Sequence, residues 1–151
     1  MGKMNILIII PSLRLAGAER LTVDLVNNLS AGAFNIHLFT FESELDQLQF
    51  MRKDGLIFYN YPRKSKFDLY PLKQLVQIIS TEKIDVIYCA MPISFLFGLI
   101  AKIIAKSQAK LIASIHTTIN KDSKNEMFER FIYAPLLVHC DKIIAVCDNL
   151  R

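Results

Sequence analysis

The chain alternates between short, continuous apolar runs and longer segments in which apolar residues recur every three or four positions. The continuous runs are rich in β-branched residues, which is typical of strands covered on both faces of a sheet. The longer segments have the period of amphipathic helices. Parallel neighbouring strands need crossover connections, and these are usually helical. The rhythm therefore predicts an α/β fold built on a mostly parallel sheet.

The pattern predicts six strands, each followed by a helix except the last. The expected strands cover residues 5–10, 34–41, 56–61, 85–90, 110–116 and 142–147. The expected helices cover residues 18–31, 43–55, 70–83, 92–106 and roughly 122–139, and Gly55 would end the second of them. Because such crossovers are right-handed, a doubly wound, Rossmann-like sheet with helices on both faces is the expected topology.

Size and composition indicate one folded domain. The 151 residues fit a single domain, and 52% hydrophobic against 21% charged residues excludes a disordered chain. The longest apolar segment, 91–104, contains Lys102 and is shorter than the ~20 residues that cross a bilayer, so it predicts a buried helix. The start reads as a first strand and not as a secretion signal. The end, "CDNLR", falls where a further helix would open, which suggests a fragment.

Charge and cysteine content narrow the partners. A net charge of +4 favours anionic partners only mildly, and without a basic arm we expect no nucleic acid partner. Cys89, Cys140 and Cys147 form no CxxC pair, which predicts reduced thiols and a cytosolic protein. His37 and His139 are expected to be structural. Their spacing gives no metal site, so no metal is assigned.

The first strand runs into "PSLRLAGAER", a loop of small residues that opens a helix. In open α/β sheets, ligands gather at the carboxyl ends of the strands, where this loop would lie. Free backbone N–H groups at the start of the helix would hold a phosphate group. In the alternative reading, Gly17 only makes the turn and Glu19 only complements the helix dipole. With a single glycine and no GxGxxG, composition leaves both readings open.

Three stretches resemble one protein family. "ILIIIPSLRLAGAERLTVDLVNNLS" is similar to the opening of the retaining glycosyltransferases of family 4, in which a strand leads through Gly-Gly-Ala-Glu into a helix. "IASIHTTI" resembles the family's fifth-strand segment that ends in His, and "CDKIIAVCDNLR" resembles a later segment. The three lie in the family's order. The stretch 42–83 adds nothing specific.

The resemblance implies the amino-terminal, acceptor-side half of a GT-B enzyme, in which two Rossmann-like domains face each other across a cleft. Residues 1–151 would form this domain, and the nucleotide-sugar domain would be absent. The whole enzyme would transfer a sugar from a nucleotide-sugar donor to a glycan or lipid-linked acceptor with retention, without a metal or other cofactor. Family members frequently act on lipid-linked or membrane-surface acceptors, so the resemblance implies a role in cell-envelope polysaccharide synthesis in the cytoplasm, at the inner face of the membrane. The 151 residues alone would not catalyse turnover.

The resemblance also places the site residues. Ala16, Gly17, Ala18 and Glu19 would lie near the donor diphosphate and the acceptor. His116 would face the transferred sugar as the catalytic residue, where an imidazole donates to a sugar hydroxyl or shields a developing charge. Without the resemblance, the alternative for His116 is a half-buried histidine bonded to a neighbouring loop.

Arg14 and Arg20 flank the small-residue loop. A guanidinium presents a planar set of donors to an anion, so Arg14 is a further candidate contact, with plain exposure as the alternative. Two residues depart from the family pattern. Ala16 stands where the first glycine is common, and Cys147 stands where a serine is usual.

Other readings remain open. Glu42 follows the second strand where a dehydrogenase would bind a ribose, but the missing glycine fingerprint favours a solvated residue or the N-terminal charge of a helix. The chain would then be a stand-alone nucleotide-binding Rossmann or flavodoxin-like module, or a non-catalytic interaction domain. A basic and aromatic group would meet either anionic lipid or only water; it comprises Tyr59, Tyr61, Arg63, Lys64, Lys66, Phe67 and Tyr70.

Overall fold

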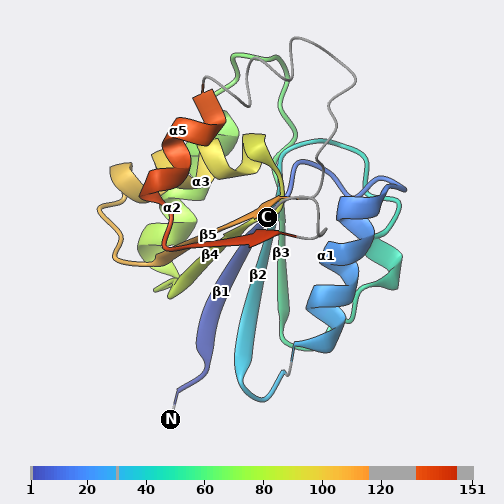
Figure 1. The fold of residues 1–151 in the computed structure, drawn as a ribbon. Coiled ribbons are helices and arrows are strands. Elements are labelled where there is room, and N and C mark those ends of the chain that lie inside the picture. Colours follow the sequence, from blue (N-terminus) through green and yellow to red (C-terminus); the bar gives the residue numbers. More distant parts are fainter. Residues whose placement is uncertain (1, 30, 116–131, 146–151) are drawn as a thin grey trace.

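The structure, a computed structural model, describes residues 2–29, 31–115 and 132–145. Six parallel strands form one sheet in the order β3-β2-β1-β4-β5-β6. The doubly wound topology predicted from the sequence is confirmed (Figure 1). The strands are β1 (Met4–Ile9), β2 (Phe34–Thr40), β3 (Leu56–Asn60), β4 (Val86–Cys89), β5 (Lys110–Ile115) and β6 (Lys142–Ala145).

Helices cover both faces of the sheet. On one face lies α1, and on the other lie α2, α3 and α5 (Figure 1). Their bounds are α1 (Gly17–Asn28), α2 (Tyr70–Thr81), α3 (Pro92–Ile104) and α5 (Ala134–Leu136), with short 3-10 helices η1 (Leu48–Phe50) and η3 (Leu137–His139). Each face has its own hydrophobic cluster, so alternate residues of β1 point into different cores.

The winding of the sheet reverses at β1. This strand pairs with β2 on one side and with β4 on the other, because the chain first moves outward through β2 and β3 and then returns to begin β4. Such a reversal opens a crevice at the carboxyl ends of the two central strands. The loop that follows β1 and leads to Gly17 lies at this point.

The helix predicted over residues 43–55 is wrong. The structure has turns there and only the short η1. Besides short turns of its own, the backbone of this segment bonds to the loop after β1: the Leu13 N–H donates to the Glu44 carbonyl at 2.8 Å, and the Gln47 N–H donates to the Leu13 carbonyl at 2.8 Å. Gly55 has a φ of +69°, in the left-handed region that glycine favours, and it ends a turn into β3.

The face that α1 buries differs from the predicted one. The spacing of Ala18, Leu21, Leu25, Val26 and Leu29 predicts one buried apolar face, but Leu21 is exposed and Glu19 is buried together with Thr22, Val23 and Val26. The helix is therefore rotated so that its first turn directs a carboxylate inward. The predicted helix of residues 122–139 is described only from 132 onward, where α5 and η3 lie.

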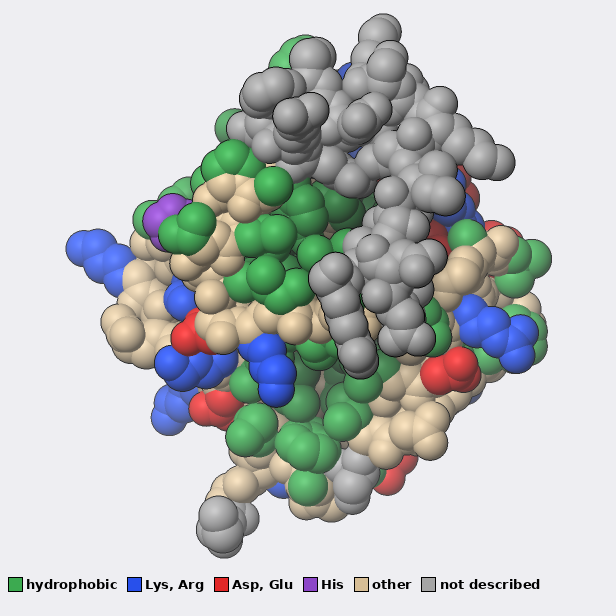
Figure 2. All heavy atoms as spheres, in the orientation of Figure 1, with side chains coloured by type: hydrophobic (Ala, Val, Ile, Leu, Met, Phe, Trp, Pro, Cys, Tyr) green, Lys and Arg blue, Asp and Glu red, His purple; other side chains and the backbone are tan. Residues whose placement is uncertain are grey.

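Two properties bear on partners. None of the helices in the described ranges is long and apolar enough to cross a membrane. All four residues of the edge strand β6 are exposed, and hydrophobic side chains gather around this edge in Figure 2.

Gly98 in α3 should be required for packing. A Cβ at this position would lie 2.7 Å from Cys89 Sγ and 3.2 Å from Ile9 Cδ1, both fully buried side chains. Overpacking of this kind costs about 1–3 kcal/mol, and the higher helix propensity of Ala recovers about 1 kcal/mol. We therefore expect Gly98→Ala to lower the free energy of unfolding in urea. Adding Cys89→Ala should restore part of the loss, and a stability that is unchanged in the single variant would contradict the packing argument.

Candidate functional site

The loop after β1 is fixed by the segment that follows β2. Besides the two backbone bonds that join Leu13 to this segment, the Pro11 carbonyl accepts the N–H groups of Phe41 and Glu42 at 3.1 and 2.9 Å. A loop that carries polar backbone at the edge of a sheet needs such partners. The result is a loop held from outside, which delivers the chain to the start of α1 in one geometry.

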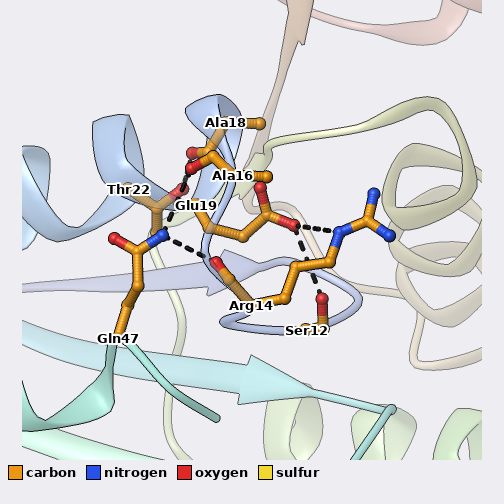
Figure 3. Close-up of polar contacts among 7 residues, drawn as sticks. All are labelled: Ser12, Arg14, Ala16, Ala18, Glu19, Thr22 and Gln47. Atoms are coloured by element: carbon orange, nitrogen blue, oxygen red, sulfur yellow. Dashed lines mark hydrogen bonds and ion pairs between the residues drawn. The ribbon is translucent and has the colours of Figure 1, made fainter. Parts of the chain in front are cut away.

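Gln47 supplies the strongest side-chain hold on this loop. Its side-chain amide donates to the Arg14 carbonyl at 2.6 Å and to the Ala16 carbonyl at 3.2 Å (Figure 3). Only 6% of Gln47 is exposed, so these bonds are made away from bulk water. The sequence prediction missed Gln47, because it placed the residue in a polar helix and no local pattern marks a contact across 31 positions.

A buried carboxylate lies at the first turn of α1. Glu19 is 2% exposed, and its Oε1 lies 3.2 Å from Arg14 Nε and 3.5 Å from the Ser12 hydroxyl, which donates to it. The Arg14 side chain is 60% exposed, and Figure 3 shows the two terminal nitrogens of its guanidinium pointing away from Glu19. Glu19 thus partners the inner edge of Arg14 and leaves the outer donors available. Ser12 was not predicted.

The start of α1 leaves backbone donors unused. Ala16, the N-cap, is extended and makes no side-chain cap, and its carbonyl accepts the Arg20 N–H at 3.1 Å. Within the described part of the chain, no hydrogen bond is found for the N–H groups of Gly17, Ala18 or Glu19. These donors lie at the positive end of the helix dipole, which suits an anion.

Gly17 is not required by the fold. A Cβ built on it would meet nothing within 4 Å, and its φ lies outside the left-handed region. The interpretation in which Gly17 only makes the turn therefore has no steric basis. A methyl group at this position would occupy the open space above the free N–H groups.

Several hollows border this region, and one of about 400 Å³ is lined by Gly17, Ala18, Arg20, Leu21 and Asp24. A groove of about 640 Å³ runs beside α1, and its lining comprises Leu15, Ala16, Gly17, Arg20, Val23, Asp24, Asn27, Gln47 and Phe50. A smaller hollow of about 290 Å³ lies between the loops after β2 and β3. There Glu42 pairs with Arg63 at 2.8 Å, and the Arg63 guanidinium lies over the Phe41 ring at 5.1 Å. Glu42 is therefore neither a free acid nor the start of a helix.

The remaining candidate residues add little to the description of the site. His37 is buried in β2 and stacks on Tyr59, and burial holds the pKa of its imidazole below the usual value, so it is neutral at pH 7. No group of three His, Cys, Asp or Glu side chains in the described ranges could hold a metal ion. His116 and Cys147 lie outside the described residues.

Removing the amide of Gln47 should loosen the loop. Gln47→Ala deletes two hydrogen bonds, each worth about 0.5–1.5 kcal/mol net, while the Arg14 and Ala16 carbonyls keep the backbone bonds that they accept from Ala16 and Arg20. We expect a lower free energy of unfolding in urea and faster hydrogen exchange at residues 13–17. Gln49→Ala is the matched control, because Gln49 is exposed and bonds only to the neighbouring Asp46 carbonyl. Equal losses in the two variants would contradict the role assigned to Gln47.

Solved structures of similar fold include HepE of Anabaena and a glycosyltransferase from Rickettsia africae ESF-5. HepE of Anabaena, in a complex with UDP and glucose, matches with a TM-score of 0.71 and 17% identity over 93% of this chain and 37% of HepE. The complex of HepE with UDP-glucose matches with a TM-score of 0.62 and 19% identity, over 85% of this chain and 35% of HepE. A glycosyltransferase from Rickettsia africae ESF-5 matches with a TM-score of 0.63 and 15% identity, over 97% of this chain and 43% of the Rickettsia protein. The chain thus spans less than half the length of these proteins, and at such identities the likeness concerns the fold.

The two comparisons of sequence give different results. No curated protein matches the chain. The sequence model of Glycosyltransferase Family 4 matches residues 15–151, a range that begins in the loop after β1 and includes all of Ala16 to Glu19. The match spans most of the chain and agrees with the topology of the sheet. This chain belongs to Glycosyltransferase Family 4.

Proposed function

We propose that residues 1–151 form the acceptor-side domain of a glycosyltransferase that moves a sugar from a nucleotide-sugar donor to a glycan or lipid-linked acceptor, with retention and without a metal. The observation that carries the proposal is the set of unused N–H donors at Gly17, at the point where the sheet reverses. Family membership supports sugar transfer, and HepE, solved with UDP and with UDP-glucose, supports a uridine nucleotide as the donor class.

The described residues would act by binding charge. The N–H groups of Gly17 and Ala18 would donate to oxygens of the donor diphosphate, which the helix dipole also favours. The outer guanidinium nitrogens of Arg14 would add charge-assisted bonds, since Glu19 holds only the inner edge. Diphosphate is the leaving group, so donors placed on it stabilise the charge that develops there during transfer. His116 would contact the transferred sugar, and this role stays a prediction.

The two rival functions are less well supported. A stand-alone nucleotide-binding module would need the glycine fingerprint of a dinucleotide fold, and Glu42, the residue it would use on a ribose, is paired with Arg63. A non-catalytic interaction domain would have side chains filling the carboxyl edge. The open groove beside Gly17 favours a ligand there instead.

Gly17→Ala tests the donor contact. The protein at its full natural length, supplied with UDP-glucose and other nucleotide sugars, should release nucleotide diphosphate. A methyl group at Gly17 should lower kcat/KM about tenfold or more by displacing a charge-assisted hydrogen bond, while the melting temperature stays unchanged.

Gly2→Ala is the matched control, because a Cβ there also meets nothing and the residue lies before β1, at the opposite edge of the sheet. If no nucleotide sugar is turned over by the wild type, the proposed function is wrong. If Gly17→Ala is as active as Gly2→Ala, the donor does not lie on this backbone.

The loop between β3 and α2 supports contact with a membrane surface. Phe67 is 92% exposed and Leu69 is also exposed, and Lys64 and Lys66 flank them. Asp68 accepts the N–H groups of Lys64 and Tyr70, which hold the pKa of its carboxyl below the usual value, so its charge is used within the loop. Apolar tips beside lysines suit anionic head groups, and the proposed setting is the cytoplasmic face of a membrane.

Vesicle binding tests this contact. With phosphatidylcholine vesicles containing phosphatidylglycerol, the double variant Lys64→Gln, Lys66→Gln should bind more weakly by about fivefold for each lysine removed, since each contributes about 1 kcal/mol near such a surface. The control double variant, Lys3→Gln with Lys53→Gln, changes lysines that precede β1 and β3 at the far edge of the sheet. Equal binding by the two double variants would contradict the proposed surface.

A further inference from the structure

The groove beside α1 has two walls that the sequence does not place together. One wall is the flank of α1 from Gly17 to Asn27, and the other is the segment from Gln47 to Phe50, drawn in teal next to α1 in Figure 1. The groove begins at the carboxyl edge of the sheet and descends along the helix. The seven steps of the chain from Gly17 to Asp24 span about 10 Å at the rise of an α-helix, so the groove extends well beyond the N–H donors.

The walls are fastened at both ends. At the upper end, Gln47 bonds to the Arg14 and Ala16 carbonyls. At the lower end, the Asn27 side chain donates to the Phe50 carbonyl at 2.9 Å and accepts the Arg52 N–H at 2.8 Å. The groove is therefore formed before any ligand arrives, and Asn27 acts as a positioning residue for Phe50. A preformed site avoids part of the ordering cost of binding.

The rim of the groove exposes large apolar side chains. Leu15 is 76% exposed and Phe50 is 60% exposed, although both line the groove. Neither belongs to a hydrophobic cluster of the described residues. An exposed aromatic face beside a hollow of this size, within the ~300–1,000 Å³ of ordinary ligand sites, offers a flat apolar platform.

The groove is lined by one positive and one negative side chain, so their charges cancel. Arg20 and Asp24 lie one helical turn apart, and neither makes a side-chain ion pair or hydrogen bond within the described ranges. One supplies only donors and the other only acceptors. A nucleotide or other polyanion would meet the Asp24 carboxylate, and a purely apolar chain would desolvate both charges without pairing them. A neutral molecule with many hydroxyl groups and apolar ring faces satisfies all of these groups together.

We propose that this groove binds a neutral stretch of the acceptor glycan, with a sugar ring on Phe50 and sugar hydroxyl groups on Arg20 and Asp24. That the bound glycan is the acceptor rests on the proposed function, but the subsite itself is separate and lies along the flank of α1. The donor would occupy the N–H groups at Gly17, and the acceptor chain would leave the reaction point along the helix. Specificity for the acceptor would then depend in part on the segment from Gln47 to Phe50, which lies in the stretch 42–83 to which the family resemblance adds nothing specific.

Binding to an array of defined neutral and acidic oligosaccharides tests the groove. The full-length protein should bind a subset of the neutral glycans. Phe50→Ala and Asp24→Asn should each weaken binding to that subset about tenfold, in line with the loss of one hydrogen bond from a charged group or one ring contact. Ile103→Ala and Asp54→Asn are the matched controls, because they change an exposed apolar residue and an exposed acid that lie away from the groove. Unchanged melting temperatures would show that the variants fold.

The outcomes separate the two proposals. If nucleotide diphosphate is released from a nucleotide sugar but no neutral glycan binds, or Phe50→Ala binds as the wild type does, the groove is not a glycan subsite and the proposed function stands. If glycan binding depends on Phe50 and Asp24 but no nucleotide sugar is turned over, the proposed function fails and the groove remains a glycan site. Gly17→Ala should leave glycan binding intact, and its loss would place the glycan on the N–H groups and overturn the separate subsite.

Discussion

Burial of β1 on both faces is the constraint on which the rest of the fold depends. Leu7, Ile8, Ile9 and Ile10 are fully buried, and each is worth roughly 1.5–3 kcal/mol relative to exposure. Alternate residues enter the two clusters, so α1 is needed on one face and α3 on the other. β1 is central and paired on both sides, and the loop after it continues this pairing only as far as Pro11, whose carbonyl accepts the Phe41 and Glu42 N–H groups. The loop rises at the crevice, and the start of α1 follows there.

That loop is shaped by a competition between local and distant hydrogen bonds. The sequence of residues 43–55 has the composition of a helix, and Leu45, Leu48 and Met51 do pack inward, whereas Phe50 is exposed. A helix there would leave the carbonyl of Leu13 and the N–H of Leu13 without the partners they have on residues 44 and 47. Unpaired backbone groups at a sheet edge cost about as much as lost hydrogen bonds. The segment therefore stays irregular, and this irregularity brings the Gln47 amide beneath the loop.

The strands could be predicted because their information is local. Continuous β-branched runs and intervening helical periods are properties of short windows, and all six strands are found within a residue or two of the expected bounds where the structure describes them. Gly17 could be marked by its neighbours. Ser12 and Gln47 could not, because their roles arise only when the loop closes over residues far along the chain. Glu19 shows the same limit: an acid in the first turn of a helix suits the dipole whether it faces water or the core, and only the rotation of α1 directs it inward to Arg14.

The charged groups at the carboxyl edge differ in whether they are already paired, and this difference decides which kind of ligand suits each of them. Arg63 is held by Glu42 and by the Phe41 ring, and the inner edge of Arg14 is held by Glu19, so neither is a freely moving cation. The lysines at 64 and 66 form no ion pair in the described ranges and stand beside apolar tips, where an extended anionic surface suits them better than a single phosphate. The N–H groups at Gly17 are fixed and directional, which suits a phosphate at one position. The proposed contacts thus differ in how firmly each charge is held: fixed backbone donors would receive the diphosphate, exposed lysines would meet a surface, and the Arg20 and Asp24 side chains on the flank of α1 would receive a neutral chain.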